Sequence, residues 1–238
     1  MWMQWDMMFW VFVGPAMLLA LWAQLRVKSA YARASQVRDS RGMTGAQAAR
    51  AILDANGLRN IQIEPAQGWL SDHYDPRHKV LRLSPDVYGG NSLAAVGIAA
   101  HEAGHALQEA RHYGPLAIRN GLVPLASTGG ALSTVFIMIG MILMSMHSVW
   151  GQGVLYTGIG LFAVMVLFQI VNLPVEFDAS RRAKVVLAEM GIVRSDEMPM
   201  VRDVLGAAAM TYVAATLVAV MQLLYFLWRS GLLGGRRD

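Results

Sequence analysis

Two histidines and a glutamate within five residues form the strongest chemical signal in the sequence, His101-Glu102-Ala103-Gly104-His105. Residues four apart on a helix lie on one face, so His101 and His105 can bind one ion while Glu102 reaches a water at that ion. This pattern is typical of zinc hydrolases. The alternative interpretation is a pair of helix-surface histidines beside a glutamate, and the rest of the chain must decide between the two.

A catalytic zinc site needs a third protein ligand and keeps a fourth position for water. Glu176 is the candidate that the order of hydrophobic segments favours. Two such segments lie between His105 and Glu176, and a membrane hairpin made from them returns Glu176 to the side that holds the two histidines. The same hairpin puts His147 in a turn on the opposite side, which excludes it as a ligand.

The ligand types indicate the metal and the reaction. The chain contains no cysteine, so thiolate ligands are excluded. Two imidazoles with one carboxylate favour Zn2+, although cobalt or manganese would fit a similar geometry. Zinc held in this way lowers the pKa of a water towards about 7 and polarises a carbonyl, and Glu102 would accept the proton as the water attacks an amide. We therefore expect hydrolysis of a peptide bond in a protein or peptide substrate.

The elements that must position these residues belong to an unusually apolar chain. Of its 238 residues, 55% are hydrophobic and 15% are charged. Four uncharged segments are each close to the ~20 residues that cross a hydrocarbon core, so the sequence predicts four transmembrane helices, at residues 7–25, 128–146, 154–171 and 206–228. We expect the first to be an uncleaved anchor, because no basic residue precedes it and no cleavage site of small residues follows it.

The basic residues predict the orientation in the membrane. The 20 Lys and Arg residues fall between Arg26 and Arg119, between Arg181 and Arg202, and after Trp228. The positive-inside tendency puts the first two groups, and with them the His-Glu pentad, on the cytoplasmic side. The basic tail then falls on the outside, against the tendency. Anionic membrane lipids account for the net charge of +4, and no basic patch with interleaved aromatics indicates a nucleic acid as partner.

A polar region between the first two segments, from about Val27 to Gly121, is long enough for a small domain beside the membrane. Thr44 and Gln47 form a capping box ahead of a predicted helix at residues 46–55, and Gly57 suits the position just past its end. The charged residues that open the region are also expected to be helical.

Two short segments of this region, residues 61–64 and 79–83, alternate apolar and polar residues and predict strands. Gly68 and Asp75-Pro76 mark turns between them, so we expect either a hairpin or two edge strands.

The pentad lies on a predicted helix that Asn91-Ser92 caps and Gly114-Pro115 ends. The apolar stretch before His101 covers only residues 93–100, and charged residues follow within two turns, so this helix is too short to span a membrane. We expect the site to lie beside the membrane and not within it.

Four stretches of sequence resemble one family, the YugP-type neutral zinc metallopeptidases of the bacterial membrane. They are LSDHYDPR at 70–77, AAHEAGHALQ at 99–108, LPVEFDASRRA at 173–183 and TYVAA at 211–215. The likeness runs in order along almost the whole chain. Such proteins are similar in layout to the HtpX-type and CAAX-prenyl metalloproteases, in which a membrane hairpin separates the His-Glu-x-x-His helix from a glutamate ligand.

The resemblance implies His101, His105 and Glu176 as zinc ligands and Glu102 as the general base, in a multi-pass protein of the bacterial inner membrane. One departure is visible. The HtpX-type segment has an aspartate four residues after the ligand glutamate, and this chain has Ser180 there. Either Ser180 takes over the supporting hydrogen bond or Asp178 supplies it from another direction.

The fold implied is a mainly α membrane protein with four transmembrane helices and a small α+β, zincin-like domain beside the membrane. Its expected parts are a transmembrane anchor at 1–26, the metallopeptidase domain at 27–121, a transmembrane hairpin at 122–173, the segment with the third ligand at 174–205, and a last transmembrane helix with the tail at 206–238.

Two further residues are candidates for the reaction. His73 would line the cleft as a substrate or oxyanion group, and Tyr212 would donate to an oxyanion near the membrane surface. The alternatives are a turn without a catalytic role for the Asp- and Pro-rich stretch around His73, and an interfacial anchor for Tyr212.

The charged residues after Glu176 and the small residues of the last segment have structural interpretations. Arg181, Arg182 and Lys184 are expected to contact lipid headgroups, with the alternative that one of them pairs with Glu176 or Asp178. Residues 206–209 and 214–215 are small and favour close helix packing, within the chain or in a homo-oligomer or with another membrane protein.

Three functions remain open at this point. The favoured one is a membrane-anchored zinc endopeptidase. The second is a site-2-type intramembrane protease, to whose ligand motif Asn172-x-Pro174 ahead of Asp178 bears a weak likeness. The third is a non-catalytic membrane assembly factor that keeps zinc for structure.

Overall fold

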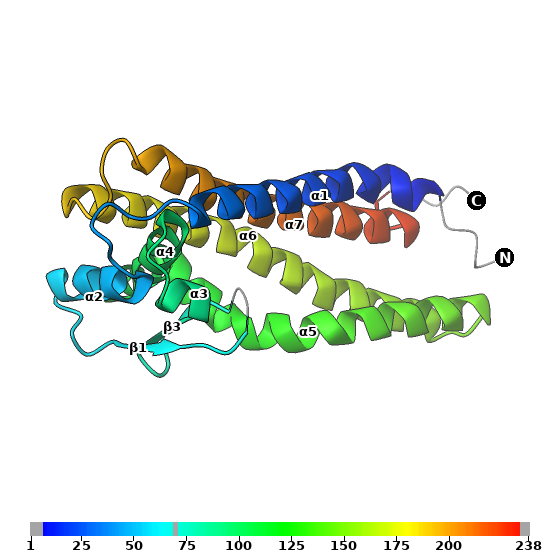
Figure 1. Cartoon of the computed structure of the whole chain (residues 1–238). Coiled ribbons are helices and arrows are strands. Elements are labelled where there is room, and N and C mark those ends of the chain that lie inside the picture. The colour runs from blue at the N-terminus through cyan, green and yellow to red at the C-terminus, as the bar shows by residue number, and fades with distance from the viewer. Residues whose placement is uncertain (1–6, 69–70, 234–238) are drawn as a thin grey trace. The chain divides into compact units, whose positions relative to one another are not determined.

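A computed structural model describes residues 7–68 and 71–233 of the chain. Its elements in chain order are α1 (Met7–Ser35), α2 (Gly45–Ala55), β1 (Gln62–Pro65), β2 (His73–Asp75), β3 (Val80–Leu83), α3 (Pro85–Tyr88), α4 (Leu93–Ala110), α5 (Gly114–Ser145), α6 (Gly151–Glu189) and α7 (Met198–Arg229) (Figure 1). The chain forms two compact units. Unit 1 holds residues 7–22, 118–172 and 212–233, and unit 2 holds residues 23–68, 71–117 and 173–211.

Four of the helices, α1, α5, α6 and α7, are long and apolar enough to cross a membrane. This confirms the prediction of four spans. The helices continue beyond the uncharged segments, because helical hydrogen bonds join backbone groups and charged residues can make them as well as apolar ones. As a result α6 runs without a break through Pro174 to Glu189, and Glu176 lies on the same helix as the third span.

Gly114-Pro115 has a different role from the one predicted. The pentad helix α4 ends at Ala110, and Gly114 is the first residue of α5. A proline near the first position suits a helix N-terminus, because its missing N–H would have no partner inside the helix there. This pair therefore begins a helix and does not end one.

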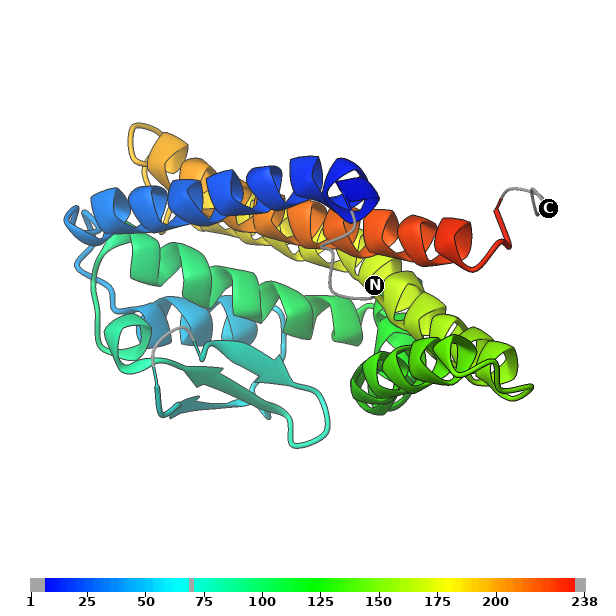
Figure 2. The same ribbon diagram turned by 90° about the vertical axis from the view of Figure 1, so that its right-hand side faces the viewer.

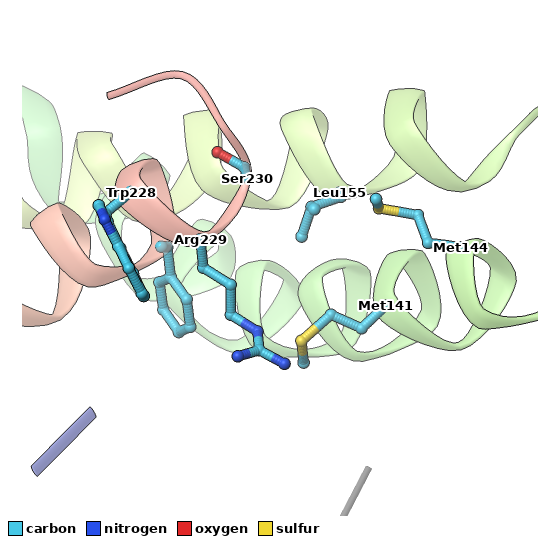
Figure 3. A pocket seen from close by; sticks show the side chains of 7 residues that line it. Met141, Met144, Leu155, Trp228, Arg229 and Ser230 are labelled. Atoms are coloured by element: carbon cyan, nitrogen blue, oxygen red, sulfur yellow. The ribbon is translucent and has the colours of Figure 1, made fainter. Parts of the chain in front are cut away.

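Unit 1 is held together by apolar side chains of α5, α6 and α7, among them Ile137, Phe162 and Val166. Glycines bring two of these helices close together, since a Cβ added to Gly158 would lie 2.7 Å from the backbone nitrogen of Ile137. A cavity of about 360 Å³ in this unit is lined by apolar residues together with Arg229 and Ser230 (Figure 3). Unit 1 thus has the apolar character expected of the membrane-spanning part.

Unit 2 contains a three-stranded sheet in the order β1-β3-β2 (Figure 2). β1 pairs with β3 in parallel, so the hairpin alternative for residues 61–64 and 79–83 is wrong. The alternative of two edge strands is wrong for residues 79–83, because β3 lies between β1 and β2. The hairpin joins β2 to β3 instead, with His73 opposite Arg82 and Asp75 opposite Val80. Asp75-Pro76 does mark a turn, but the residues before it form an edge strand that the sequence pattern does not reveal.

The short helices of unit 2 begin as the sequence predicts. The Thr44 side chain accepts a hydrogen bond from the Gln47 backbone and the Gln47 side chain accepts one from the Thr44 backbone, which completes the capping box of α2. Gly57 follows that helix with a φ of 76°, a conformation that glycine adopts without strain. Ser92 caps α4 by accepting from the backbone of Ala95.

The core of unit 2 surrounds α4. Buried residues of α2 and the sheet, such as Ile52 and Leu81, belong to one apolar cluster with Val96 of α4, Leu187 of α6 and Val201 of α7. A second cluster of small residues joins Ala94 of α4 to residues of α1 and α7. The pentad helix is therefore enclosed by packing on several sides, which holds its side chains in fixed positions.

Candidate metal centre

The structure brings together the three residues expected to bind zinc. His101 and His105 lie one turn apart on α4, and Glu176 comes from α6. Ligand atoms of the three residues all lie within 4.8 Å of one another. Oε2 of Glu176 is 3.3 Å from Nε2 of His101 and 3.8 Å from Nε2 of His105. Three atoms that can bind a metal therefore converge on one point.

The donor set and its surroundings fit a zinc ion. Glu176 and His105 are buried, with 5% and 7% of their surface exposed, and His101 is nearly so. Both histidines turn Nε2 towards Glu176 and use Nδ1 for a hydrogen bond to the protein. Two imidazoles, each held by a hydrogen bond at its other ring nitrogen, together with one carboxylate, are the ligands typical of a catalytic zinc site.

Ser180 contacts His101 directly, and Asp178 is linked to His105 through Gln108. Nδ1 of His101 is 3.0 Å from Oγ of Ser180, so the serine occupies the place where the resemblance implied an aspartate. Asp178 accepts a hydrogen bond from Gln108, and Gln108 is bonded to Nδ1 of His105. Of the two alternatives drawn from the sequence, the structure thus has the hydrogen bond between Ser180 and His101, while Asp178 is linked to the other histidine only through Gln108.

The arginines after Glu176 pair with Asp178. Nε of Arg182 lies 2.5 Å from Oδ2 of Asp178, and Arg181 forms an ion pair with the other carboxylate oxygen. Arg182 also lies over the ring of Tyr113, 5.7 Å from its centre. Both arginines thus pair with Asp178, where the alternative drawn from the sequence was such a pair for one basic residue, and the contact with lipid headgroups stays a prediction.

Glu102 is almost completely buried beside the ligands, with 8% of its surface exposed. Burial raises the pKa of its carboxyl group to about 7, and His101 opposes this rise. Asp72 and His73 are close enough for their charges to shift the same pKa, Asp72 upwards and His73 downwards. A carboxyl group with a pKa near neutrality can both accept and release a proton at the pH of a cell.

His101 also has a perturbed pKa in the metal-free site. Burial alone would lower it, but the hydrogen bond with Glu176 and the negative charges of Glu102 and Glu176 outweigh that effect and raise it. The surroundings of His101 therefore favour its protonated form when no metal is bound.

The raised pKa of Glu102 predicts a pH-dependent stability for the metal-free protein. A carboxyl group whose pKa rises from 4.5 to about 7 on folding adds stability below pH 4.5, and this contribution is lost as the pH passes through 7. The raised pKa of His101 likewise lowers the stability of the metal-free protein as the pH rises. We expect the melting temperature of the metal-free protein to fall between about pH 5 and about pH 8, and to fall less in Glu102→Gln. Equal falls in the two proteins would contradict this assignment.

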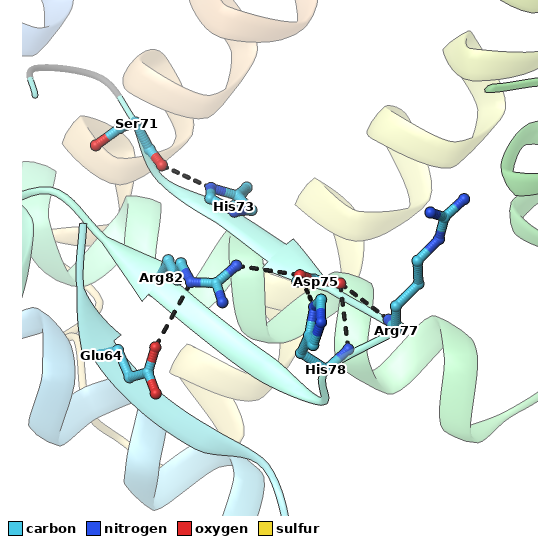
Figure 4. Close-up of polar contacts among 7 residues, drawn as sticks. All are labelled: Glu64, Ser71, His73, Asp75, Arg77, His78 and Arg82. Carbon is cyan, nitrogen blue, oxygen red and sulfur yellow. Dashed lines mark hydrogen bonds and ion pairs between the residues drawn. The ribbon is translucent and has the colours of Figure 1, made fainter. Parts of the chain in front are cut away.

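The strand β2 and the residues around it form a polar network next to α4 (Figure 4). Asp75 accepts hydrogen bonds from His78 and Arg82, and the bond from His78 is the main cause that holds its pKa well below the usual range. The hydroxyl of Tyr74 donates to Glu109 on α4, and Lys79 pairs with the same carboxylate. Two contacts to one carboxylate thus attach the edge hairpin to the C-terminal turn of the pentad helix.

His73, at the start of β2, is exposed, and its Nδ1 lies 2.7 Å from the carbonyl oxygen of Ser71 (Figure 4). The preceding residue Asp72 accepts hydrogen bonds from the backbone and the hydroxyl of Ser84. These contacts fix the segment near Glu102, and a part of His73 in the reaction stays a prediction. Tyr212 belongs to unit 1, and its role stays a prediction as well.

A glycine inside the pentad sets the distance between the two helices of the site. A Cβ added to Gly104 would lie 2.6 Å from the carbonyl oxygen of Ala179 and 3.3 Å from its Cα. Backbone atoms cannot rotate away as a flexible side chain can, so only glycine allows α6 to pass this close to α4. This close approach lets Glu176 and Ser180 reach His101.

Sequence reasoning missed Gln108 and Gly104. The sequence does contain a partial signal for Gln108, because it stands three residues after His105 and so faces the same side of the helix. Its burial at 0% exposure depends on the passage of α6, which the sequence pattern does not give.

Comparison with known proteins agrees with this geometry. Residues 9–231 match the model of a family described as "Putative neutral zinc metallopeptidase". A protein of Bacillus subtilis (strain 168) named "Putative membrane protease YugP" is 44% identical over 220 residues, which cover 92% of this chain and 95% of that protein. No solved structure matches. With the four long apolar helices, these matches identify a membrane protein, and the chain belongs to this family of zinc metallopeptidases, which its sequence motifs resemble.

Proposed function

We propose that this protein is a membrane-anchored zinc endopeptidase that hydrolyses peptide bonds in membrane proteins or in chains close to the membrane. The observation that carries the proposal is the convergence of His101, His105 and Glu176, whose ligand atoms lie within 4.8 Å of one another beside the buried carboxyl group of Glu102. The same three residues without Glu102 would suit a structural metal. Glu102 is what makes the site suitable for hydrolysis.

The residues of the site have distinct parts in this proposal. His101, His105 and Glu176 would hold Zn2+, which when bound lowers the pKa of a water and polarises a substrate carbonyl. Glu102 accepts a proton from the attacking water on its carboxylate and delivers it to the leaving nitrogen. Ser180 and Gln108 keep the two imidazole rings in place. His73 is proposed as a group that contacts the substrate, and Tyr212 as a donor to the oxyanion.

The location of the site relative to the membrane is also part of the proposal. The helix that carries the pentad is not among the candidate spans, which argues for a site beside the membrane and against a site-2-type intramembrane protease. The distribution of Lys and Arg supports the cytoplasmic side of a bacterial inner membrane.

Replacement of the third ligand tests the proposal. We expect Glu176→Gln to weaken zinc binding by more than the ~10–100-fold that is typical of losing a supporting hydrogen bond, because it removes the negative ligand itself. Cleavage of casein in detergent should stop with it. Zinc content is measured by elemental analysis of the purified protein, and casein cleavage is followed on gels with and without a chelator.

The same measurements on the parent protein distinguish the alternatives. Zinc at one ion per chain with chelator-sensitive cleavage supports the endopeptidase. Zinc at that level without cleavage of any tested peptide or membrane protein would indicate an assembly factor. Glu189→Gln is a suitable control, because Glu189 is an exposed residue at the end of α6.

A further inference from the structure

Gln108 is the most completely buried polar side chain near the metal centre, with 0% of its surface exposed. Each of its polar atoms has a partner. Nε2 donates to the backbone oxygen of Val175 at 2.7 Å and to Oδ2 of Asp178 at 3.0 Å, and Oε1 lies 3.0 Å from Nδ1 of His105. The amide therefore joins the metal-binding histidine on α4 to two acceptors on α6.

The chemistry of these partners fixes the orientation of the amide. A backbone carbonyl and a carboxylate only accept hydrogen bonds, so the NH2 group of Gln108 must face Val175 and Asp178. The Oε1 atom that remains can only accept. Nδ1 of His105 must then carry a proton and donate it, so Nε2, which is turned towards Glu176, is the ring nitrogen left to bind a metal.

Asp178 is itself held as an acceptor. Arg181 and Arg182 both pair with its carboxylate, and the side chain of Arg182 is only 12% exposed. Two guanidinium groups stabilise the ionised carboxylate, so it offers no proton to the amide of Gln108. The charges of Arg181 and Arg182, which act through Asp178, therefore help to determine the orientation of the Gln108 amide.

The two histidines differ in this respect. The partner of His101 is the hydroxyl of Ser180, which can donate or accept by rotating its hydrogen. It fixes the position of the His101 ring without selecting which nitrogen carries the proton. Gln108 cannot rotate in that way without losing both bonds to α6, so it selects one form of His105.

We propose that Gln108 is a positioning residue that holds His105 with a proton on Nδ1 and with Nε2 facing the metal site, and that Asp178 with its two arginines holds Gln108. The proposal rests on the zinc site of the proposed function. It adds that the site is prepared for the metal before the metal binds, at least at His105.

A methionine at position 108 tests the proposal by removing the hydrogen bonds and keeping a side chain of similar length. We expect Gln108→Met to weaken zinc binding by about 10–100-fold, the range typical of a supporting partner of a metal-binding histidine. Zinc affinity is measured by competition with a chelator of known affinity. Gln62→Met is the matched control, because Gln62 is exposed on β1 in the same unit.

A second measurement does not depend on activity or on bound metal. Nitrogen NMR of the metal-free protein, labelled at its six histidines, reports which ring nitrogen carries the proton. The signal of His105 is assigned from its loss in His105→Gln. We expect the Nδ1-protonated form in the parent and in Gln62→Met, and a substantial share of the Nε2-protonated form in Gln108→Met.

The outcomes separate the two proposals. A parent protein that binds no zinc overturns the proposed function, and the NMR result still decides the role of Gln108. Zinc affinity within twofold of the parent in a folded Gln108→Met overturns the positioning role. If Gln108→Met does not fold, a parent protein whose His105 carries its proton on Nε2 overturns it equally.

Discussion

Replacing Glu102 by glutamine is expected to lower the rate of peptide hydrolysis by about 10²–10⁴-fold, the usual contribution of a general base, while zinc binding is kept. Glutamine has the shape of glutamate, but its amide cannot accept the proton of the attacking water. The metal should stay because Glu102 is not one of the three residues whose ligand atoms converge. The measurement is kcat/KM on a fluorogenic peptide together with the zinc content of the same sample.

Two controls make the result specific. Glu189→Gln repeats the change at an exposed site on α6 and should leave the rate at the parent level. A melting curve should show that Glu102→Gln folds, and at neutral pH in the absence of metal it should melt no lower than the parent, since a buried amide costs less than a buried charge. A zinc-loaded variant with the parent rate would show that another group takes the proton.

The parts of the structure that the sequence predicts are those with local causes. The four spans follow from uncharged segments of about the right length, and the capping box of Thr44 and Gln47 follows from residues three apart. The same is true of the metal ligands on α4, because the helical repeat alone puts His101 and His105 on one face. Each of these signals is complete within one stretch of chain.

Pairing between distant segments is where the sequence-based prediction failed. The parallel pairing of β1 with β3 and the edge strand β2 depend on which segments meet in space, and a segment such as His73-Tyr74-Asp75 has turn-forming neighbours that hide it. The roles of Gln108 and Gly104 depend in the same way on the close passage of α6 along α4. Glu176 was an exception, because the membrane limits the sides on which a residue can emerge.

The site is therefore produced by one contact between two helices. α6 supplies Glu176 as a ligand, Ser180 as the partner of His101, and Asp178 as the partner of Gln108. All three lie within five consecutive residues, so one displacement of this turn changes the ligand and both supports together. The residue that permits the contact is expected to matter as much as the ligands.

Gly104→Ala is expected to disrupt the site by separating these helices. The added Cβ would lie 2.6 Å from the carbonyl oxygen of Ala179, well inside normal contact distance, and backbone atoms must shift to relieve it. Overpacking of this kind costs about 1–3 kcal/mol of stability. Glu176 lies one turn before Ala179, so its displacement should also weaken zinc binding by more than about 10-fold. Loss of one supporting hydrogen bond weakens metal binding by about 10-fold at the lower end of its usual range.

A glycine with open surroundings provides the control that separates this steric effect from a general effect of alanine. Gly206 lies inside α7, and among the described residues no atom outside the backbone of that helix turn and the neighbouring residues lies within 4 Å of a Cβ added there. Gly206→Ala should raise stability by up to about 1 kcal/mol, because alanine favours the helix. Melting temperature and zinc affinity are compared across the parent and both variants. If Gly104→Ala behaved like Gly206→Ala in both measurements, the close approach of α6 would not be what positions Glu176.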